Sequence, residues 1–326
     1  MTTPATAMGG TPTGGEEEPG WTGSTRRLGD RIFSGTAIGS GILILVTLAA
    51  VAAFLLYEGF PALTADGADL PGGEGFISFV GPLLFGTVLA AVIALVVALP
   101  LSVGIALFIS HYAPRRVAAA LGYLVDLLAA VPSVVYGLWG IYFLAPQLVP
   151  AYRWLEENLG FIPLFAGPTS ATGRTMLTAG LVLAVMILPI MTAVNREVFL
   201  QTPRLQEEAS LALGATRWEM IRMTVLPFGR SGIVSGSMLG LGRALGETLA
   251  VAMVLSPADV ISTNLIGSVN SNTIAANIAL DFPESSGLAV NALIASGLVL
   301  FALTFLVNYA ARAIVNRRRD FSGANA

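Results

Sequence analysis

Long apolar runs separated by short polar segments make up most of this chain. A helix needs about 18 or more predominantly apolar residues to cross a bilayer, and the runs therefore predict six membrane-spanning helices. Their predicted bounds are Ser34–Tyr57, Val80–Ile109, Ala118–Val149, Arg174–Val194, Ser231–Ser256 and Gly287–Ala310. The second and third contain Pro100 and Pro132, each of which removes a backbone donor that neighbouring groups must compensate in a bilayer. The pattern predicts an all-α integral membrane protein with tilted or broken helices around a protein-lined interior.

Composition agrees with this fold class and excludes several kinds of chemistry. Hydrophobic residues make up 55% of the chain and charged residues only 11%, against roughly 25% charged residues in soluble domains. The chain has no cysteine and a single histidine, His111, which leaves no ligand set for zinc and no disulfide. We expect no cofactor, no metal site, no catalytic residue and no nucleic-acid partner.

The placement of arginine predicts the orientation of the spans, because basic residues collect on the cytoplasmic side of membrane proteins. Arginines lie before span one, after span two, between spans four and five, and after span six. They are Arg26, Arg27, Arg31, Arg115, Arg116, Arg196, Arg204, Arg217, Arg222, Arg230, Arg312, Arg317, Arg318 and Arg319. The intervening loops are mainly acidic. Both termini and the loop between spans four and five are therefore predicted to be cytoplasmic.

A single membrane domain between two polar tails is the predicted organisation. Residues 1–30 are rich in Gly, Thr, Pro and Glu and cannot form a core, so they are predicted to be a disordered cytoplasmic tail. Residues 31–315 are predicted to form the six-helix domain, with a cytoplasmic loop at 195–230. Residues 316–326 are predicted to form a second cytoplasmic tail.

Within the cytoplasmic loop, the residues from Thr202 to Pro227 predict a two-helix elbow. Thr202 is suited to cap a first helix, and Gly214 is suited to end that helix in the left-handed conformation. Thr216 and Glu219 have the spacing of a capping box at the start of a second helix, which is predicted to end before Pro227. The elbow could receive another protein, or it could be an amphipathic loop that lies on the bilayer.

The fifth predicted span carries charge inside the membrane. On a continuous helix Gly232, Gly236, Gly240, Arg243 and Glu247 would lie within roughly 80° of one another. Small residues four apart permit close helix packing, and intramembrane charges face a protein interior or a wet cavity. The arginine and the glutamate are four residues apart, so each could neutralise the other.

Two interpretations of Arg243 and Glu247 follow from the residues. They could be a structural ion pair that holds this helix to a partner subunit. Alternatively, Arg243 could belong to an anion pathway, with Glu247 orienting the arginine or moderating its affinity. A guanidinium group matches the oxygens of an oxyanion such as phosphate in a bidentate arrangement.

The cytoplasmic loop carries a recognisable motif. Glu208-Ala209-Ser210, Gly214-Ala215 and Val225-Leu226-Pro227 resemble the "EAA" loop of ABC importer permeases, with Ser210 in place of the usual third alanine. In that family the loop docks in a groove of the ATPase subunit. The resemblance therefore implies that ATPase coupling rests on Glu208, Ala209, Gly214 and Ala215.

Two further segments resemble one branch of these permeases. Gly242–Ala250 and Val131–Gly140 are similar to the PstC family of phosphate-specific ABC importer permeases. The related PstA permeases typically continue their motif with Ala-Pro, where this chain has Leu249-Ala250. The resemblance extends over most of the chain outside the tails.

The resemblance implies a function and a set of partners. The chain would be a multi-pass subunit of the cytoplasmic membrane that translocates inorganic phosphate, with Arg243 and Glu247 needed for transport. It would pair with a second permease, PstA, above two copies of the ATPase PstB and below an extracytoplasmic binding protein, PstS. It would hydrolyse no ATP itself.

Some alternatives stay open. The cargo could be another oxyanion, such as sulfate or molybdate, or the chain could report phosphate supply to a sensor kinase. The predicted outer loop 256–286 contains Asn264, Asn270, Asn272 and Asn277, and it could contact a binding protein or be an ordinary solvated loop. His111 is expected at the membrane interface.

Overall fold

The computed structural model describes residues 28–319 of the chain. The chain divides into two units, Met1–Val51 and Ala52–Ala326. Helix α1 (Leu28–Thr64) contains the described part of the first unit and continues into the second. Of the predicted tails, 1–30 and 316–326, residues 1–27 and 320–326 lie outside the described residues.

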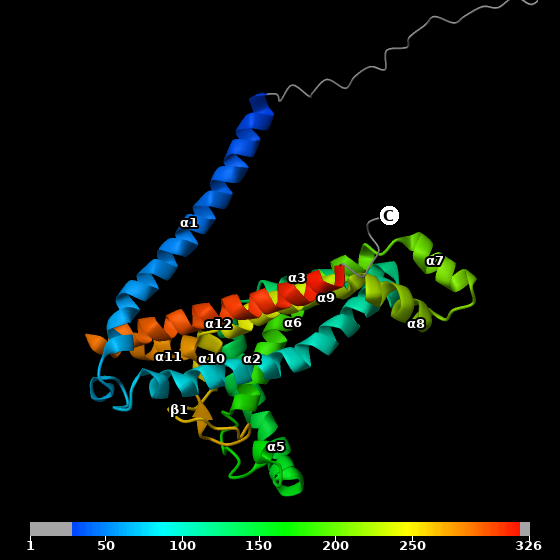
Figure 1. Ribbon diagram of the computed structural model, residues 1–326. Coiled ribbons are helices and arrows are strands. Elements are labelled where there is room, and N and C mark those ends of the chain that lie inside the picture. The colour runs from blue at the N-terminus through cyan, green and yellow to red at the C-terminus, as the bar shows by residue number, and fades with distance from the viewer. Residues whose placement is uncertain (1–27, 320–326) are drawn as a thin grey trace, which may run out of the picture. The chain divides into compact units, whose positions relative to one another are not determined.

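Helices make up nearly all of the second unit (Figure 1). The long ones are α2 (Phe76–Leu107), α6 (Met176–Leu200), α9 (Leu226–Leu245) and α12 (Leu288–Arg319). The shorter ones are α3 (Arg115–Ala129), α4 (Ser133–Trp139), α5 (Ala145–Leu159), α7 (Arg204–Ala212), α8 (Arg217–Met220), α10 (Leu249–Val254) and α11 (Ile274–Asp281). Two short strands, β1 (Pro257–Ala258) and β2 (Asn270–Ser271), pair in parallel. Single turns of 3₁₀ helix cover Gly67–Asp69, Pro163–Phe165 and Phe282–Glu284.

Among the described residues, five helical segments are long and apolar enough to cross a membrane. They are Arg31–Thr64, Phe76–Tyr112, Ser133–Leu159, Met176–Leu200 and Leu288–Ala313. The predicted fifth span, Ser231–Ser256, does not meet this criterion. Its first part is α9, a helix of 20 residues that is rich in Gly and Ser and ends at Leu245. The count of six spans and the side of the termini stay predictions.

The third predicted span is broken at Pro132, as its length and its proline indicated. Helix α3 ends at Ala129, and α4 starts at Ser133 with Pro132 as its N-cap residue. Proline suits this position because it lacks an N–H group and disfavours a helical conformation in the residue before it. Pro100 has no such effect, because α2 continues through it to Leu107.

Two other prolines are accommodated by widened helical turns. A π-helical turn at Gly140–Leu144 precedes Pro146, and another at Ile221–Val225 precedes Pro227. A proline ring clashes with the carbonyl four residues earlier, and in both cases that carbonyl lies in the middle of the π turn. The prediction that the elbow's second helix ends before Pro227 was therefore wrong, because the chain continues as helix from α8 into α9.

The core of the second unit lies where α2, α6 and α9 pack together. Figure 1 shows α2, α9 and α12 running side by side, with α6 crossing them. The contact is made by small residues. Buried alanines of α2 face this core at Ala90, Ala91, Ala94 and Ala98. Small side chains let helix backbones approach closely, which favours van der Waals packing where no hydrophobic driving force separates protein from lipid.

Helix α9 packs on α6 through its glycines. A Cβ atom added at Gly232 would overlap Val198, and one added at Gly240 would lie 2.8 Å from the Met191 side chain. At Gly236 the added atom would lie 3.2 Å from Oδ1 of Asn195. These three glycines, predicted to pack against another helix, therefore lie against α6 of the same chain.

The predicted outer loop 256–286 is folded into the protein. Asn270, Asn272 and Asn277 are each less than 5% exposed. Asn270 accepts a hydrogen bond from Met176 N at 2.9 Å and donates to three backbone carbonyls. Asn270 therefore connects segments inside the fold, and because all three asparagines are buried, the alternative of an ordinary solvated loop was wrong for this part of the loop.

The start of α11 is buried against α2. The backbone N–H of Ile274 donates to the Thr87 hydroxyl at 2.9 Å. One residue before that threonine, Gly86 faces the carbonyl oxygen of Asn272, and a Cβ atom at this glycine would overlap that oxygen. Gly86 is therefore required for the close approach of the two backbones.

We predict that Gly86→Ala destabilises the protein by about 1–3 kcal/mol, because the new methyl group has no space. The matched control is Gly104→Ala in the same helix, where no atom lies within 4 Å of the added carbon. Since alanine is the better helix former by about 1 kcal/mol, the control should be neutral or stabilising. Thermal unfolding of the detergent-solubilised protein measures both, and equal midpoints for the two variants would contradict the packing described above.

Candidate functional site

The elbow consists of α7 and α8, which project together from one end of the second unit (Figure 1). Gly214 between them has a φ of +88°, the left-handed conformation that was predicted. The predicted capping box is also confirmed, since Thr216 accepts from Glu219 N and Glu219 accepts from Thr216 N at 2.8 Å. These hydrogen bonds from Thr216 lower the pKa of Glu219 below its usual value. The conformation of this turn is therefore determined by the residues of the turn itself.

The start of α7 differs from the sequence prediction. Its N-cap residue is Pro203, and no side chain caps the helix. Thr202 instead is 4% exposed, and its buried hydroxyl has no hydrogen-bond partner in the described part of the chain. The proline ring fixes the entry to the helix without a side-chain acceptor, because its φ is already suited to a helical start.

The elbow presents apolar side chains to its surroundings. None of the nine residues of α7, all of them described, is buried. Leu205, Leu213 and Trp218 are 78%, 90% and 56% exposed. The motif residues are placed in the same way, because Glu208, Ala209 and Gly214 are exposed and Ala215 is half-buried. A projecting surface that joins apolar residues to a small-residue turn is suited to bind another protein.

Arg243 lies in the last turn of α9, at the edge of a pocket of about 570 Å³. The pocket lies between α6, α9 and α12 and is lined by Ile190, Ser235, Met238, Leu239, Gly242, Arg243 and Asn308. Ser235 donates its hydroxyl proton to Ser231 O at 2.8 Å, which leaves its oxygen free to accept. The pocket thus combines one cation with neutral polar groups in an otherwise apolar wall.

The helix that was predicted to carry both charges ends between them. Helix α9 ends at Leu245, and α10 begins at Leu249. Glu247 lies in the break, is 9% exposed, and accepts a hydrogen bond from Ala250 N at 3.1 Å. In the described part of the chain it forms no ion pair with Arg243. The expectation that the two charges neutralise each other on one helix was therefore wrong.

Glycine explains why the helix breaks here. Gly246 is the C-cap of α9, and glycine is both a poor helix former and a common helix end. The first four N–H groups of a new helix lack hydrogen-bond partners within that helix. The Glu247 carboxylate accepts a hydrogen bond from one of them, the N–H group of Ala250. Glu247 thus caps α10 through one of the helix's backbone N–H groups.

The structure brings together the two segments that carried the family resemblance. Helix α10 packs against α4, so that residues near 250 contact residues near 137. A Cβ atom at Gly137 would lie 3.0 Å from Cα of Ala250, and one at Gly140 would lie 2.9 Å from the Val254 side chain. Small residues in one segment therefore fit the short helix of the other.

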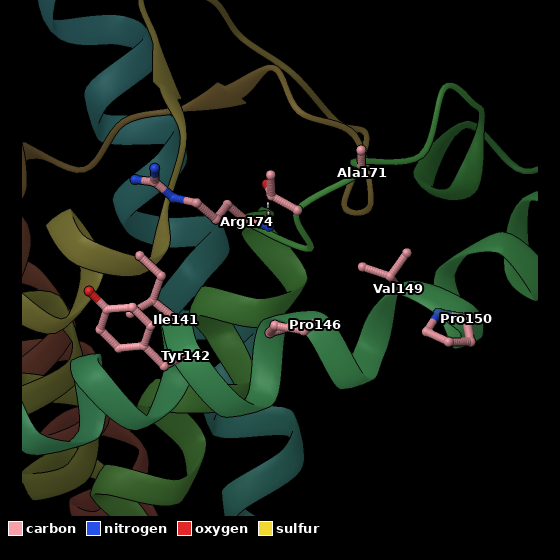
Figure 2. A pocket seen from close by; sticks show the side chains of 8 residues that line it. Ile141, Tyr142, Pro146, Val149, Pro150, Ala171 and Arg174 are labelled. Carbon is pink, nitrogen blue, oxygen red and sulfur yellow. Dashed lines mark hydrogen bonds between the residues drawn. The ribbon is translucent and has the colours of Figure 1, made fainter.

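The far end of α10 is held by Arg174, which donates to Leu255 O at 2.8 Å. Arg174 also lines a second pocket of about 560 Å³ (Figure 2). Figure 2 shows Pro146, Val149 and Pro150 on the α4–α5 segment, facing the loop that carries Ala171 and Arg174. Apart from this arginine and Thr172 its walls are apolar or aromatic. One terminal nitrogen of the guanidinium is bonded to Leu255 O, whereas its buried Nε has no hydrogen-bond partner among the described residues.

Sequence reasoning missed Ser235, Asn308 and Arg174. Asn308 is a polar residue inside the apolar run of α12, and intramembrane polarity is a signal that could have drawn attention to it. Arg174 entered the sequence analysis only as the first residue of the fourth predicted span. Its contact with the end of α10 depends on tertiary structure.

Comparison with known proteins identifies the family. A family model described as "Binding-protein-dependent transport system inner membrane component" matches residues 98–320. The "Phosphate transport system permease protein PstC 2" of Mycobacterium tuberculosis is 49% identical over 300 residues, which cover 88% of this chain and 92% of that protein. The protein named PstC of Mycobacterium leprae is 46% identical over 305 residues, covering 90% and 95%. This chain belongs to the PstC family of ABC importer permeases.

Solved structures agree with this fold. A permease chain of a bacterial ABC transporter for alginate aligns with a TM-score of 0.54 and 15% identity, covering 86% of this permease and 96% of that chain. A second alginate transporter structure gives 0.52 and 16%, covering 87% and 99%. At these identities the likeness shows the fold alone.

Family membership settles the general role of the chain. It is a multi-pass inner membrane permease, and it works with an ATPase subunit and with a binding protein. ATP hydrolysis belongs to a separate subunit, so the permease itself is no enzyme.

We predict that Glu247→Ala destabilises the permease by about 1 kcal/mol, the usual cost of a lost helix cap. Glu247→Gln should cost clearly less, because the amide oxygen can still accept from Ala250 N. Thermal unfolding of the purified protein measures both. If glutamine were as damaging as alanine, charge and not capping would be the main contribution of Glu247.

Proposed function

We propose that this permease imports inorganic phosphate across the cytoplasmic membrane. The single observation that carries the proposal is the polar pocket at Arg243 in a chain 46–49% identical to proteins named phosphate transport system permeases. Phosphate is an oxyanion, and a guanidinium group offers a planar set of donors that matches two of its oxygens.

The surroundings of Arg243 suit an anion that binds and leaves again. Ser235 and Asn308 add neutral hydrogen-bonding groups to the same pocket. Since the walls are otherwise apolar, the attraction between Arg243 and an anion is less screened than in water. A conduction site must still release its cargo, and a single cation with neutral polar neighbours holds a dianion less firmly than a cluster of cations would.

Glu247 is proposed to act on the pathway through α10. Its carboxylate caps α10, Arg174 holds the other end, and Gly137 and Gly140 let the helix seat against α4. A fixed α10 keeps the break after Leu245 in place, and this break sets the position of Arg243. Glu247 is therefore a positioning residue, and Arg243 is the residue that contacts phosphate.

The elbow is proposed to be the ATPase-coupling site, with Glu208, Ala209, Gly214 and Ala215 at its centre. Its exposure supports this role. In the complete importer we propose PstA as the second permease, two copies of PstB as the ATPase and PstS as the extracytoplasmic binding protein. Closure of the ATPase dimer would move the elbow and switch the access of the Arg243 pocket.

The function is tested by uptake of labelled phosphate in cells that lack their own phosphate permease. The cells receive this chain with its genomic neighbours, and excess sulfate serves as competitor. We predict uptake that requires this chain and resists sulfate. Arg243→Gln should lower the uptake rate at least tenfold, because a charged hydrogen bond contributes about 1.5–3 kcal/mol.

The control for that substitution is Arg230→Gln, since Arg230 lies on the same helix but is exposed at its other end. Uptake abolished by sulfate or molybdate would assign the permease to another oxyanion. Normal uptake by Arg243→Gln would show that the pocket is not the pathway. Normal phosphate signalling to a sensor kinase without any uptake would favour a sensory role over transport.

Coupling is tested at Gly214. An aspartate would be strained at a φ of +88° and would place a charge in the turn. We predict that Gly214→Asp prevents co-purification of the ATPase with the permease and abolishes uptake. Gly214→Asn should be milder, because asparagine has nearly the same shape as aspartate and meets the same backbone conformation but adds no charge to the turn. Intact ATPase attachment and intact uptake in the aspartate variant would refute the assignment.

A further inference from the structure

Glu207 and Ser210 lie one helical turn apart on α7, on the face that turns toward the membrane helices, which we call the inner face of α7. Oε1 of Glu207 lies 3.5 Å from Nε2 of His111, within hydrogen-bonding distance. The Ser210 hydroxyl lies 2.9 Å from that of Thr224. The inner face of α7 therefore makes two side-chain contacts with the membrane domain.

His111 is held rigidly at the end of the second membrane-spanning segment. It belongs to a π-helical turn, Phe108–Tyr112, that follows directly on α2. Its side chain is 8% exposed, and Nδ1 lies 2.7 Å from the Ser110 hydroxyl. Both ring nitrogens thus have a partner, and the ring cannot rotate without losing one of them.

The contact between Glu207 and His111 lies partly inside the protein. Glu207 is 21% exposed, and it meets a nearly buried partner that is 96 residues earlier in the chain. An acidic residue in the first turn of a helix is favourable by itself, yet this one is directed at a histidine on another element. Since no residue of α7 is buried, its position depends on such side-chain contacts.

Both receiving elements lead to the pocket at Arg243. The π turn with His111 continues from α2, which packs against α6 and α9. Thr224 belongs to the π turn that continues into α9, the helix that carries Arg243 in its last turn. A displacement of α7 therefore reaches the pocket by two routes, through α2 and through α9.

We propose that the Glu207–His111 contact transmits movement of the elbow to the second membrane-spanning segment, and that both are positioning residues for transport. This inference rests on the proposed coupling of the elbow to an ATPase. Without the contact, the ATPase still binds the outer face of the elbow and hydrolyses ATP. Its movement then reaches the pocket less effectively, so more ATP is consumed per imported ion.

The test uses the complete importer reconstituted in liposomes, and it measures ATP hydrolysed per phosphate imported. Glu207→Gln and His111→Gln should each raise this ratio about 2- to 30-fold, the range expected when a coupling contact is lost. Exchange of the two residues, His111→Glu with Glu207→His, should bring the ratio back toward that of the unmodified importer. The matched control is Glu197→Gln, since Glu197 is exposed on α6 and has no ion-pair partner among the described residues.

Three outcomes would overturn the proposal. They are an unchanged ratio in both single variants, an exchange variant no better than the singles, and loss of ATPase attachment in the single variants, which would show that the contact only maintains the fold.

Failure of the proposed coupling role of the elbow can be told apart from failure of this inference. If Gly214→Asp leaves the ATPase attached and uptake intact, the elbow is not the coupling site. If that variant fails as expected while Glu207→Gln keeps a normal ratio, only the transmission contact is refuted.

Discussion

The hydrogen bond from Ala250 N to the Glu247 carboxylate is the interaction on which the candidate pathway depends. In an apolar interior an unpaired backbone N–H group is costly, so a helix can stop and restart there only where a side chain supplies partners. Glu247 supplies one at the start of α10. Because of the break, Arg243 lies in the last turn of α9, while α10 packs separately against α4. The carboxylate of Glu247 thus stabilises the backbone at the start of α10.

Glycine makes the same region compact. Three glycines of α9 lie against α6, and Gly137 and Gly140 receive α10. Where lipid and side chains are equally apolar, close van der Waals contact takes the place of the hydrophobic effect in holding helices together. The result is a rigid wall behind the Arg243 pocket. Rigidity matters because a site that alternates between two sides of a membrane needs a frame against which its moving parts can shift.

Proline and π-helical turns shape the connection from the elbow to this frame. Pro227 would end a regular α-helix, but the π turn before it lets the helix continue from α8 into α9. The elbow is thereby covalently continuous with the helix that carries Arg243. The side-chain contact between Glu207 and His111 adds a second connection, to the segment that follows α2. The projecting elbow and the Arg243 pocket are thus connected both along the chain and through this side-chain contact.

The sequence by itself determined those features that depend only on residues close together in the chain. The apolar runs indicate the membrane helices because length and hydropathy are properties of a segment, and the four membrane-spanning segments after α1 that meet the criterion overlap the predicted ones. Gly214 and the capping box of Thr216 are determined within a few residues, since a positive φ and a reciprocal cap require only local geometry. The break at Pro132 likewise follows from the proline ring.

Other features were decided by the tertiary structure. Gly246 can sit within a helix or at its end, and the packing of α10 on α4 favours the end, which separates Glu247 from Arg243. Asn270 is polar and looks suited to solvent, but it is buried because backbone groups of distant segments need its amide. The contact between His111 and Glu207 likewise joins residues that lie far apart in the sequence. Sequence patterns describe what a residue can bond to, whereas the choice among distant partners depends on how the helices pack.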